Sequence, residues 1–267
     1  GSDNTATGKR ALYANTTGTE NVAVGANALD ANTTASYNTA LGYNSLSSNT
    51  TGAQNTAVGR HALIDCTTGT DNTAVGYNVL DELTTGSYNT GLGSNVMHKI
   101  TTGSRNIAVG YAALDATTTG NDNVAVGHQA LVANTTGANN VALGAYALDA
   151  NTTASNNTGV GYGALSTNTT GSGNTAVGRN SLVLNSTGAD NVAVGYAALH
   201  NNTTSQNTAV GHSAMFNNTS GDKNVALGYT ALNANTTASS NTAVGYQSLK
   251  ANTTAIDNVA VGSNALL

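Results

Sequence analysis

The residues that could act as nucleophiles or metal ligands are few and scattered along the 267-residue chain. It contains one cysteine, Cys66, and His61 lies in the same stretch of sequence. A catalytic thiol needs a base within hydrogen-bonding reach, and no repeated His accompanies this cysteine. A single cysteine also excludes an intrachain disulfide and a thiolate metal site. We therefore expect Cys66 to be a buried structural residue.

Acidic residues are the second candidates for chemistry. Asp65 and the pair Asp81 and Glu82 lie in adjacent repeats, and paired carboxylates can perform acid–base catalysis. We expect these acidic side chains to lie on a solvated edge of the protein. Neither a glycine-rich calcium repeat nor a phosphate-binding loop is present, so we expect no cofactor and no enzymatic activity. A sugar-cleaving solenoid is kept as a third hypothesis.

Composition excludes several classes of protein. The chain has no Pro or Trp, only 8% charged residues and a net charge of -5, whereas a typical soluble domain has about 25% charged residues. The chain has no cluster of Lys and Arg residues of the kind that forms a nucleic-acid-binding surface. No apolar run approaches the roughly 20 residues of a membrane-spanning helix. We predict neither nucleic-acid binding nor membrane insertion.

An internal repeat of 17 residues runs from Asn4 to Leu267, with the consensus N-[TV]-A-[VL]-G-x-x-A-L-x-x-N-T-T-G-x-x. Position 1 is Asn and position 5 is Gly in all sixteen repeats, and the repeat at 191–206 is one residue short. We expect residues 1–3 to be a cloning scar and lead-in, and residues 4–267 to form one domain.

The repeat length and composition select the fold class. Helical repeats need roughly 33 residues or more, and the Thr- and Val-rich start of each repeat suits a short strand. We predict an all-β protein, a parallel β-solenoid of 17-residue coils stacked about 4.8 Å apart. His128 and His212 share position 6 but lie five coils apart, about 24 Å, which is too far to share a metal ion. We expect no metal site.

Three columns of identical residues are expected to carry the structure. Asn at position 1 can form amide ladders between coils, Gly at position 5 can supply a positive φ, and Leu at position 9 is the large apolar group of each coil. The representative residues are Asn21, Asn38 and Asn55, Gly25, Gly42 and Gly59, and Leu29, Leu46 and Leu63.

Strand alternation predicts which of the other positions face inward. We place position 4, which carries Val24, Leu41 and Val58, inside the coil. Position 3 is always Ala or Gly and is then outside, which suggests that another copy of the chain packs closely on it. The alternative is a flattened coil in which this Ala faces a second internal layer.

Position 12 carries a second Asn column, which four successive repeats interrupt. These repeats contain Cys66, Leu83, Ile100 and Thr117, and Asn134 resumes the column. A lone apolar residue would leave buried amides unpaired, so the grouping of the exceptions predicts that position 12 faces inward. The alternative is duplication of one variant repeat.

The N-T-A-V-G segments at 72–76 and 241–245 belong to a recognisable pattern. Nearly the whole chain resembles the head repeats of trimeric autotransporter adhesins and the repeat arrays of bacteriophage tail fibres, although its period is longer than that of the adhesin heads. The resemblance implies a left-handed β-roll, a homotrimeric fibre, an extracellular location on a cell surface or virion, and attachment to a glycan or protein receptor. The shared motif is structural, so no receptor-binding residue carries over.

Two surface features remain as candidate binding residues. The Thr-Thr pairs at positions 13 and 14 suggest either an ice-binding array or, more simply, turn formation beside Gly. Exposed tyrosines at position 6 can stack on sugars or anchor a protein contact, or they can cover a neighbouring strand or chain. These tyrosines are Tyr43, Tyr77, Tyr111, Tyr162, Tyr196, Tyr229 and Tyr246.

The leading hypothesis is a structural or adhesive segment of an extracellular trimeric fibre. The alternative is a monomeric β-solenoid that binds ice or glycan through a flat face bearing Thr or Tyr.

Overall fold

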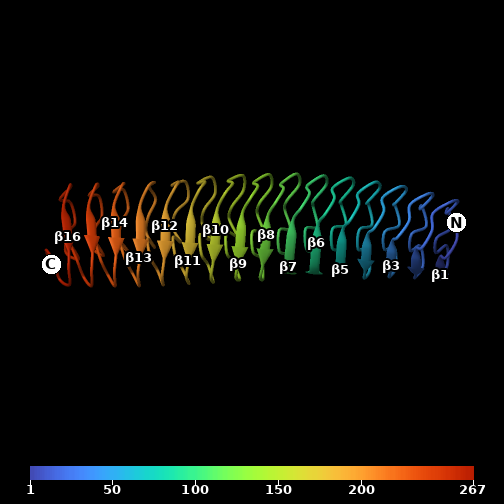
Figure 1. Cartoon of the computed structure of the whole chain (residues 1–267), viewed down its shortest axis with the longest axis horizontal. Helices are drawn as coiled ribbons and strands as arrows, with labels where there is room; N and C mark the ends of the chain where they lie inside the picture. Colours follow the sequence, from blue (N-terminus) through green and yellow to red (C-terminus); the bar gives the residue numbers. More distant parts are fainter. The chain divides into compact units, whose positions relative to one another are not determined.

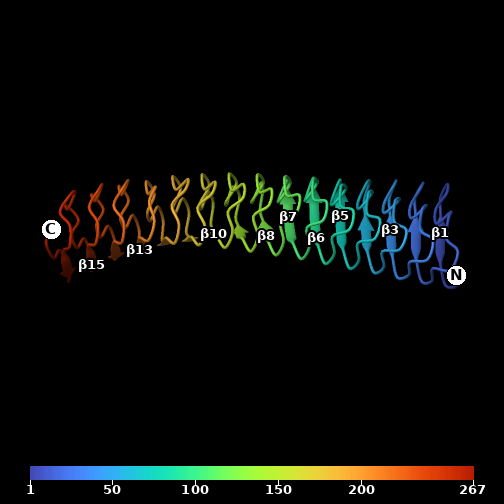
Figure 2. The ribbon, with the colours of Figure 1, turned by 90° about the horizontal axis from the view of Figure 1, so that it is seen from above.

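The computed structural model describes all residues from 1 to 267 and confirms a parallel β-solenoid without helices. The chain forms two compact units, Gly1–Thr136 and Gly137–Leu267. Within each unit, successive coils lie side by side with their strands parallel (Figure 1), as the view from above also shows (Figure 2). No helix is present that is long and apolar enough to cross a membrane.

Each unit contains eight short strands. Those of the first unit are β1 (Thr5–Thr7), β2 (Val22–Val24), β3 (Thr39–Leu41), β4 (Thr56–Val58), β5 (Thr73–Tyr77), β6 (Thr90–Ser94), β7 (Ile107–Tyr111) and β8 (Val124–Val126). Those of the second unit are β9 (Val141–Leu143), β10 (Thr158–Val160), β11 (Thr175–Val177), β12 (Val192–Val194), β13 (Thr208–Val210), β14 (Val225–Leu227), β15 (Thr242–Val244) and β16 (Val259–Val261).

Within each unit the strands pair in parallel and in the register that the repeat predicts. Thr39 of β3 pairs with Thr56 of β4, for example. The glycine at position 5 follows the last residue of each three-residue strand and lies inside β5, β6 and β7. Its φ is between 126° and 146° in every coil, a region that L-residues rarely adopt. A Cβ at Gly25 would also collide with the carbonyl group of Gly42 in the next coil. The invariant glycine is therefore required by both conformation and space.

The turns of each coil are hydrogen bonded to neighbouring coils almost as fully as the strands. The backbone N–H of Asn27, at position 7, donates to Lys9 in the preceding coil, and that of Leu29 donates to Ser45 in the following coil. Both residues have left-handed φ values, 58° and 51°. These turns thus direct donors alternately backward and forward, and the buried backbone is satisfied without longer strands.

The core differs from the prediction at positions 3 and 4. Leu at position 9 is completely buried, as in Leu46, but so is Ala at position 3, as in Ala40. The side chain at position 4 faces outward, and Leu41 is 46% exposed. The prediction that Val24, Leu41 and Val58 point inward is therefore wrong.

The reason lies in the small width of the coil. A Cβ added at Gly159, in position 3, would lie 3.3 Å from Cγ of Leu148. Position 3 therefore faces the Leu column directly, and the interior holds one large side chain opposite one methyl group. This is the flattened coil with a second internal layer, so the Ala column is unavailable as a contact between chains.

Candidate functional surfaces

The outer face of the sheet is the first candidate surface. Positions 2 and 4 alternate with the buried position 3, and in β5, β6 and β7 the strand extends to position 6. Thr73, Val75 and Tyr77 of β5 are each at least partly exposed, whereas Ala74 is buried. Each coil repeats this arrangement, so the face consists of a Thr/Val column, a Val/Leu column and an aromatic-rich column. We call positions 2 and 4 together the sheet face.

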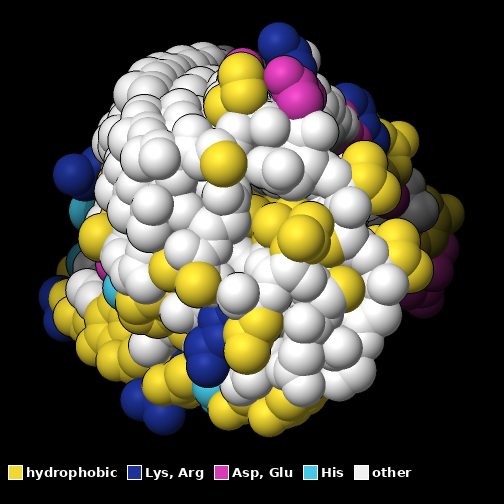
Figure 3. Space-filling view, turned by 90° about the vertical axis from the view of Figure 1, so that its left-hand side faces the viewer, with side chains coloured by type: hydrophobic (Ala, Val, Ile, Leu, Met, Phe, Trp, Pro, Cys, Tyr) yellow, Lys and Arg dark blue, Asp and Glu magenta, His cyan; other side chains and the backbone are white.

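The sheet face is apolar and uncharged. The hydroxyl groups of Thr39, Thr56, Thr73 and Thr90 make no hydrogen bond within the chain, although each lies on the face. Positions 2 and 4 carry no charged residue in any repeat. Figure 3, an end view of the molecule, shows Lys, Arg, Asp and Glu side chains scattered over the surface between hydrophobic ones. The large apolar residues of the face that are at least about one-third exposed are Val22, Leu41, Leu92, Ile107, Val126, Leu143, Val177, Val225, Leu227, Val259 and Val261.

The seven predicted tyrosines form an exposed column beside the sheet face. Their exposed fractions lie between 44% and 51%. In the second unit, the ring of Tyr229 stacks on His212 at 5.2 Å and on Tyr246 at 5.6 Å between centroids. Tyr196 continues the stack on the other side of His212, at 5.0 Å. The faces of the inner rings are therefore covered by neighbouring coils, and they present their edges to solvent.

The tyrosine column of the first unit is interrupted. The guanidinium group of Arg60 lies over Tyr77 at 5.6 Å from the ring centroid, and Tyr111 stacks on His128 at 5.4 Å. Ser94 occupies position 6 between Tyr77 and Tyr111. Tyr111 thus has an aromatic neighbour in the following coil but only a serine in the preceding coil.

The threonines at position 13 form hydrogen bonds between successive coils. The Thr33 hydroxyl donates to the carbonyl group of Thr50 at 3.1 Å, and the Thr50 hydroxyl donates to Thr67 at the same distance. These hydroxyl groups hydrogen bond to the next coil, which agrees with the prediction that the Thr-Thr pairs form turns rather than an ice-binding array. Thr34, at position 14, is exposed.

The two Asn columns form ladders that share an acceptor. The backbone N–H of Asn38 donates to Oδ1 of Asn21 at 3.0 Å, and the same contact joins Asn55 to Asn38. At position 12, Nδ2 of Asn49 donates to Oδ1 of Asn32. Nδ2 of Asn38 and Nδ2 of Asn49 both donate to the carbonyl group of Gly52, each at 2.9 Å. The sequence analysis did not predict this shared acceptor. The signal was that position 15, which Gly52 occupies, is regularly Gly or Ala.

Position 12 faces inward, and the ladder ends where the apolar residues begin. Cys66, Leu83 and Ile100 are completely buried. Oδ1 of Asn49 has no partner because the next coil provides Cys66 instead of an amide. The Cys66 thiol makes a 3.7 Å contact with the Gly69 carbonyl group, and burial raises its pKa to about 12.

A second interruption occurs at the short repeat. There Nδ2 of Asn202 donates to the carbonyl group of Thr204 at 2.7 Å, and Oδ1 of Asn185 in the preceding coil is left without a partner. Because one residue is missing, the Asn202 amide nitrogen no longer donates to Asn185. The ladder resumes in the following coil, where Nδ2 of Asn218 donates to Oδ1 of Asn202 at 2.7 Å.

The coils with apolar residues at position 12 also differ on the opposite wall. Position 8 carries Val79 and Val96 in place of the usual Ala or Ser, and both are completely buried. Position 3 is Gly91 in the coil that carries Val96, and a Cβ there would lie 2.5 Å from Cγ1 of Val79 in the preceding coil. The larger residue at position 8 therefore requires the glycine at position 3.

A cleft on these coils is the second candidate surface. Its volume is about 420 Å³. Ala112 occupies position 7 here, whereas Asn95 and Gln129 occupy this position in the coils on either side. The lining residues are Asn78, Asn95, His98, Lys99, Tyr111, Ala112, Asp115, Gln129 and Val132.

His98 lies between two carboxyl groups at the edge of this cleft. Its Nε2 is 3.3 Å from Oδ2 of Asp81, and its Nδ1 is 3.8 Å from Oδ1 of Asp115. Desolvation raises the pKa of Asp81 to about 6 and also raises the pKa of Asp115. Oδ1 of Asp81 has no hydrogen-bond partner. The sequence analysis missed this cluster, although its signal was present: the three residues are spaced by exactly one repeat.

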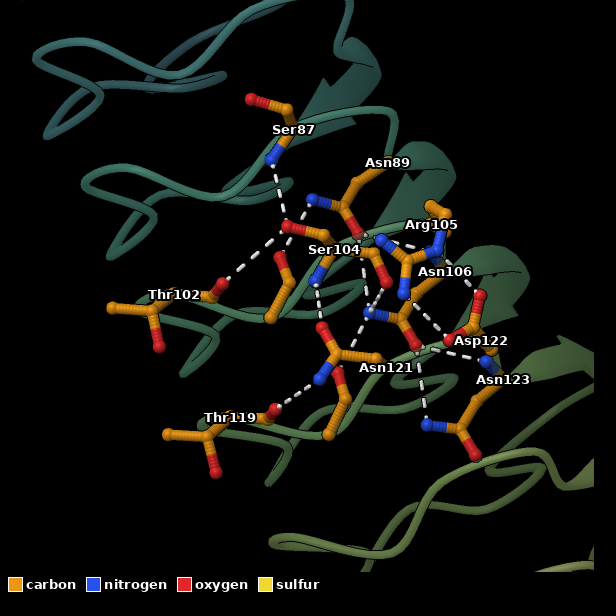
Figure 4. A network of polar contacts seen from close by, with 12 residues as sticks. Ser87, Asn89, Thr102, Ser104, Arg105, Asn106, Thr119, Asn121, Asp122 and Asn123 are labelled. Carbon is orange, nitrogen blue, oxygen red and sulfur yellow. Dashed lines mark hydrogen bonds and ion pairs between the residues drawn. The ribbon is translucent and has the colours of Figure 1, made fainter.

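Polar contacts on the outside of the same coils are structural. Figure 4 shows the Ser104 backbone N–H donating to Oδ1 of Asn121 at 2.8 Å, and Arg105 paired with Asp122 in the next coil. The guanidinium group reaches both carboxylate oxygens, at 2.6 and 2.8 Å. This hydrogen bonding lowers the pKa of Asp122. These groups connect adjacent coils.

Neither a protein-family model nor a curated protein matches the chain. Its function must therefore be argued from the geometry of its surfaces.

Proposed function

We propose that the chain is a structural segment of an extracellular trimeric fibre of the adhesin or tail-fibre type, which mediates attachment. In this proposal the copies of the chain contact one another through the sheet face. The observation that carries the proposal is the pair of outward columns at positions 2 and 4 in each unit, where Leu41, Leu92 and Leu227 are each nearly half exposed.

The extent of this face favours association. Partly exposed Val, Ile or Leu side chains recur on this face, from Val22 to Val126 in the first unit and from Leu143 to Val261 in the second. A standard protein interface buries about 800 Å² of each partner. Apolar patches of a few hundred Å² are the usual maximum for a monomer. A second and third copy of the chain present the same periodic surface, with matching spacing between coils.

The interior suits a structural role. Every coil repeats the same ladder and backbone contacts, so stability is distributed over neighbouring coils rather than concentrated in one core. The resemblance of the N-T-A-V-G segments to trimeric fibre repeats agrees with this proposal and adds the expected number of chains.

A monomer that binds ice through the same face is the second candidate. Four successive coils carry Thr39, Thr56, Thr73 and Thr90 on the sheet face, and their hydroxyl groups are free of hydrogen bonds within the chain. A monomer that inhibits ice growth would support this function and contradict association through the face.

Charged substitutions on the sheet face test the proposal. The double variant Leu41→Lys with Leu92→Lys is expected to reduce the sedimentation coefficient to that of a monomer, because burying an unpaired charge in an interface is costly. The matched control is Tyr37→Lys with Tyr88→Lys, which alters exposed residues at position 17, where Lys223 occurs naturally.

The control variant should sediment like the unmodified chain, and circular dichroism should show that both variants remain folded. If the Leu variant stays associated, the sheet face is not the contact between copies.

A further inference from the structure

The cleft over Ala112 has the properties of a ligand site rather than of a gap in the repeat. Position 7 carries Asn78, Asn95, Ala112 and Gln129 in four successive coils, so one missing amide side chain opens the hollow. The cleft lies entirely within the first unit. Its volume of about 420 Å³ falls within the range of small-molecule sites, roughly 300–1,000 Å³.

The polar groups of the cleft are suited to hydroxyl groups. The side-chain amides of Asn95 and Gln129 each offer donors and an acceptor, Lys99 offers donors, and the Asp115 carboxylate offers acceptors. A vicinal pair of hydroxyl groups, each of which donates and accepts, can be bound by such planar amides and carboxylates. Oδ1 of Asn78, which also lines the cleft, is buried without a partner.

The cleft is lined by both a basic and an acidic side chain. Lys99 and Asp115 both line the cleft, and His98 in the lining lies beside Asp81. An anionic or a cationic ligand would meet a like charge as well as an opposite one. A neutral ligand rich in hydroxyl groups meets no such repulsion.

Tyr111 adds an apolar wall to the cleft. Its ring stacks on His128 in the following coil, but the preceding coil has only Ser94 at the same position. Tyr229, in contrast, is stacked on both sides. The C–H face of a sugar ring can pack against an aromatic ring that is open on one side.

We infer that the cleft formed by Asn95, Lys99, Tyr111, Ala112, Asp115 and Gln129 binds a neutral saccharide unit. The inference deepens the attachment part of the proposed function and rests on it. The two can fail separately, because every lining residue belongs to one chain and saccharide binding does not require the sheet face to be buried.

Saturation-transfer difference NMR on the full chain tests the inference. The probes are the methyl glycosides of glucose, galactose, mannose and N-acetylglucosamine, each at millimolar concentration. We expect at least one of them to give ring-proton signals that titrate to saturation. If none of the four gives a signal, the inference is overturned.

Two alanine variants distinguish the cleft from the rest of the surface. Ala112→Gln fills the cleft with the residue type of the next coil, and Ala197→Gln makes the same change at position 7 of the second unit. Both positions have left-handed φ values, 52° and 53°, and Gln129 and Gln247 adopt the same conformation naturally. Ala112→Gln is expected to weaken binding at least about tenfold, while Ala197→Gln leaves it unchanged.

The aromatic wall is tested in the same way. Tyr111→Ser should weaken binding, whereas Tyr196→Ser, in the stacked column of the second unit, should not. Equal binding by the Ala112→Gln variant and the unmodified chain would place the saccharide elsewhere and overturn the inference.

Discussion

Two groups of coils in this molecule have the same backbone but different interior side chains at position 12. The amide-laddered coils, such as those containing Asn32 and Asn168, have a hydrogen-bonded Asn at position 12. The apolar-substituted coils have Cys66, Leu83 or Ile100 there. Strand register and the position 1 ladder continue unchanged through both groups. One backbone therefore accepts either interior, provided that neighbouring coils agree.

The difference shows that a ladder is a property of neighbours, not of single residues. An amide at position 12 needs an amide in the coil on each side, since an unpaired buried polar group costs about 1–3 kcal/mol. The unpartnered Oδ1 atoms of Asn49 and Asn185 lie where the ladder is interrupted. Grouping the apolar residues in successive coils limits such interruptions to the ends of the group.

The largest expected effect comes from exchanging the two interiors. Leu83→Asn should lower the free energy of unfolding by about 3 kcal/mol, because it removes a buried leucine and places Oδ1 beside Ile100, which offers no donor. Equilibrium denaturation in urea measures the loss.

The reciprocal change, Asn168→Leu, should cost about 2 kcal/mol because Oδ1 of Asn151 and Nδ2 of Asn185 each lose a ladder partner. If both substitutions were neutral, position 12 would not distinguish the two groups of coils.

The glycine opposite Val79 gives the next effect. Gly91→Ala should cost about 2 kcal/mol, because its Cβ would lie 2.5 Å from Cγ1 of Val79. Gly159→Ala is the matched control at position 3 and should cost much less than Gly91→Ala, since its nearest neighbours, at 3.2 and 3.3 Å, need to move only slightly.

Thermal unfolding of the two glycine variants measures the difference. Adding Val79→Ala to Gly91→Ala restores the usual pair of alanines at positions 8 and 3, and it should recover most of the lost stability. Equal stability of the two single variants would contradict the proposed coupling.

The Asp81 carboxyl group predicts a smaller, pH-dependent difference between the groups of coils. Burial raises its pKa from 3.8 to about 6, and His98, Glu82 and Asp65 modify that shift. The folded state therefore retains a proton that the unfolded chain releases, so this group favours folding below about pH 4 and loses that contribution as the pH rises through about 6.

Unfolding measured at intervals between pH 4 and pH 7 should show this decline, and Asp81→Asn should make it shallower. Asp257→Asn, which removes an exposed carboxyl group, is the control and should leave the slope unchanged. An unchanged slope in the Asp81 variant would assign the pH dependence to other groups.

The smallest effect is expected at the boundary between the two groups. Cys66→Asn supplies a donor to Oδ1 of Asn49, but its own Oδ1 then faces Leu83 without a partner. The ladder end moves by one coil, so we expect a change below about 1 kcal/mol in denaturant unfolding. A loss as large as that of Leu83→Asn would show that the cysteine itself, rather than the ladder end, determines stability there.

The sequence predicted the features that depend on identity between coils. The period of 17 defined the register, the invariant Asn indicated a ladder, and the grouped exceptions from Cys66 to Thr117 indicated an inward position 12. Each of these follows from comparing equivalent residues, because stacked coils place equivalent residues in contact.

Features that depend on absolute orientation were not predictable in this way. Alternation separates position 3 from position 4 but does not say which faces inward, and hydrophobicity favoured Leu41 over Ala40. The narrow interior, already occupied by the Leu46 column, reverses that choice. The cleft was missed because it arises from a small residue, Ala112. The charged cluster was missed because Asp81 was compared with Glu82 beside it rather than with His98, which occupies the same position in the next repeat.

Sedimentation equilibrium of the unmodified chain tests the central proposal most directly. Association through the sheet face into a trimeric fibre predicts a molar mass near three times 26.5 kDa. A mass of 26.5 kDa at all concentrations would contradict it and leave the sheet face exposed to solvent in a single solenoid.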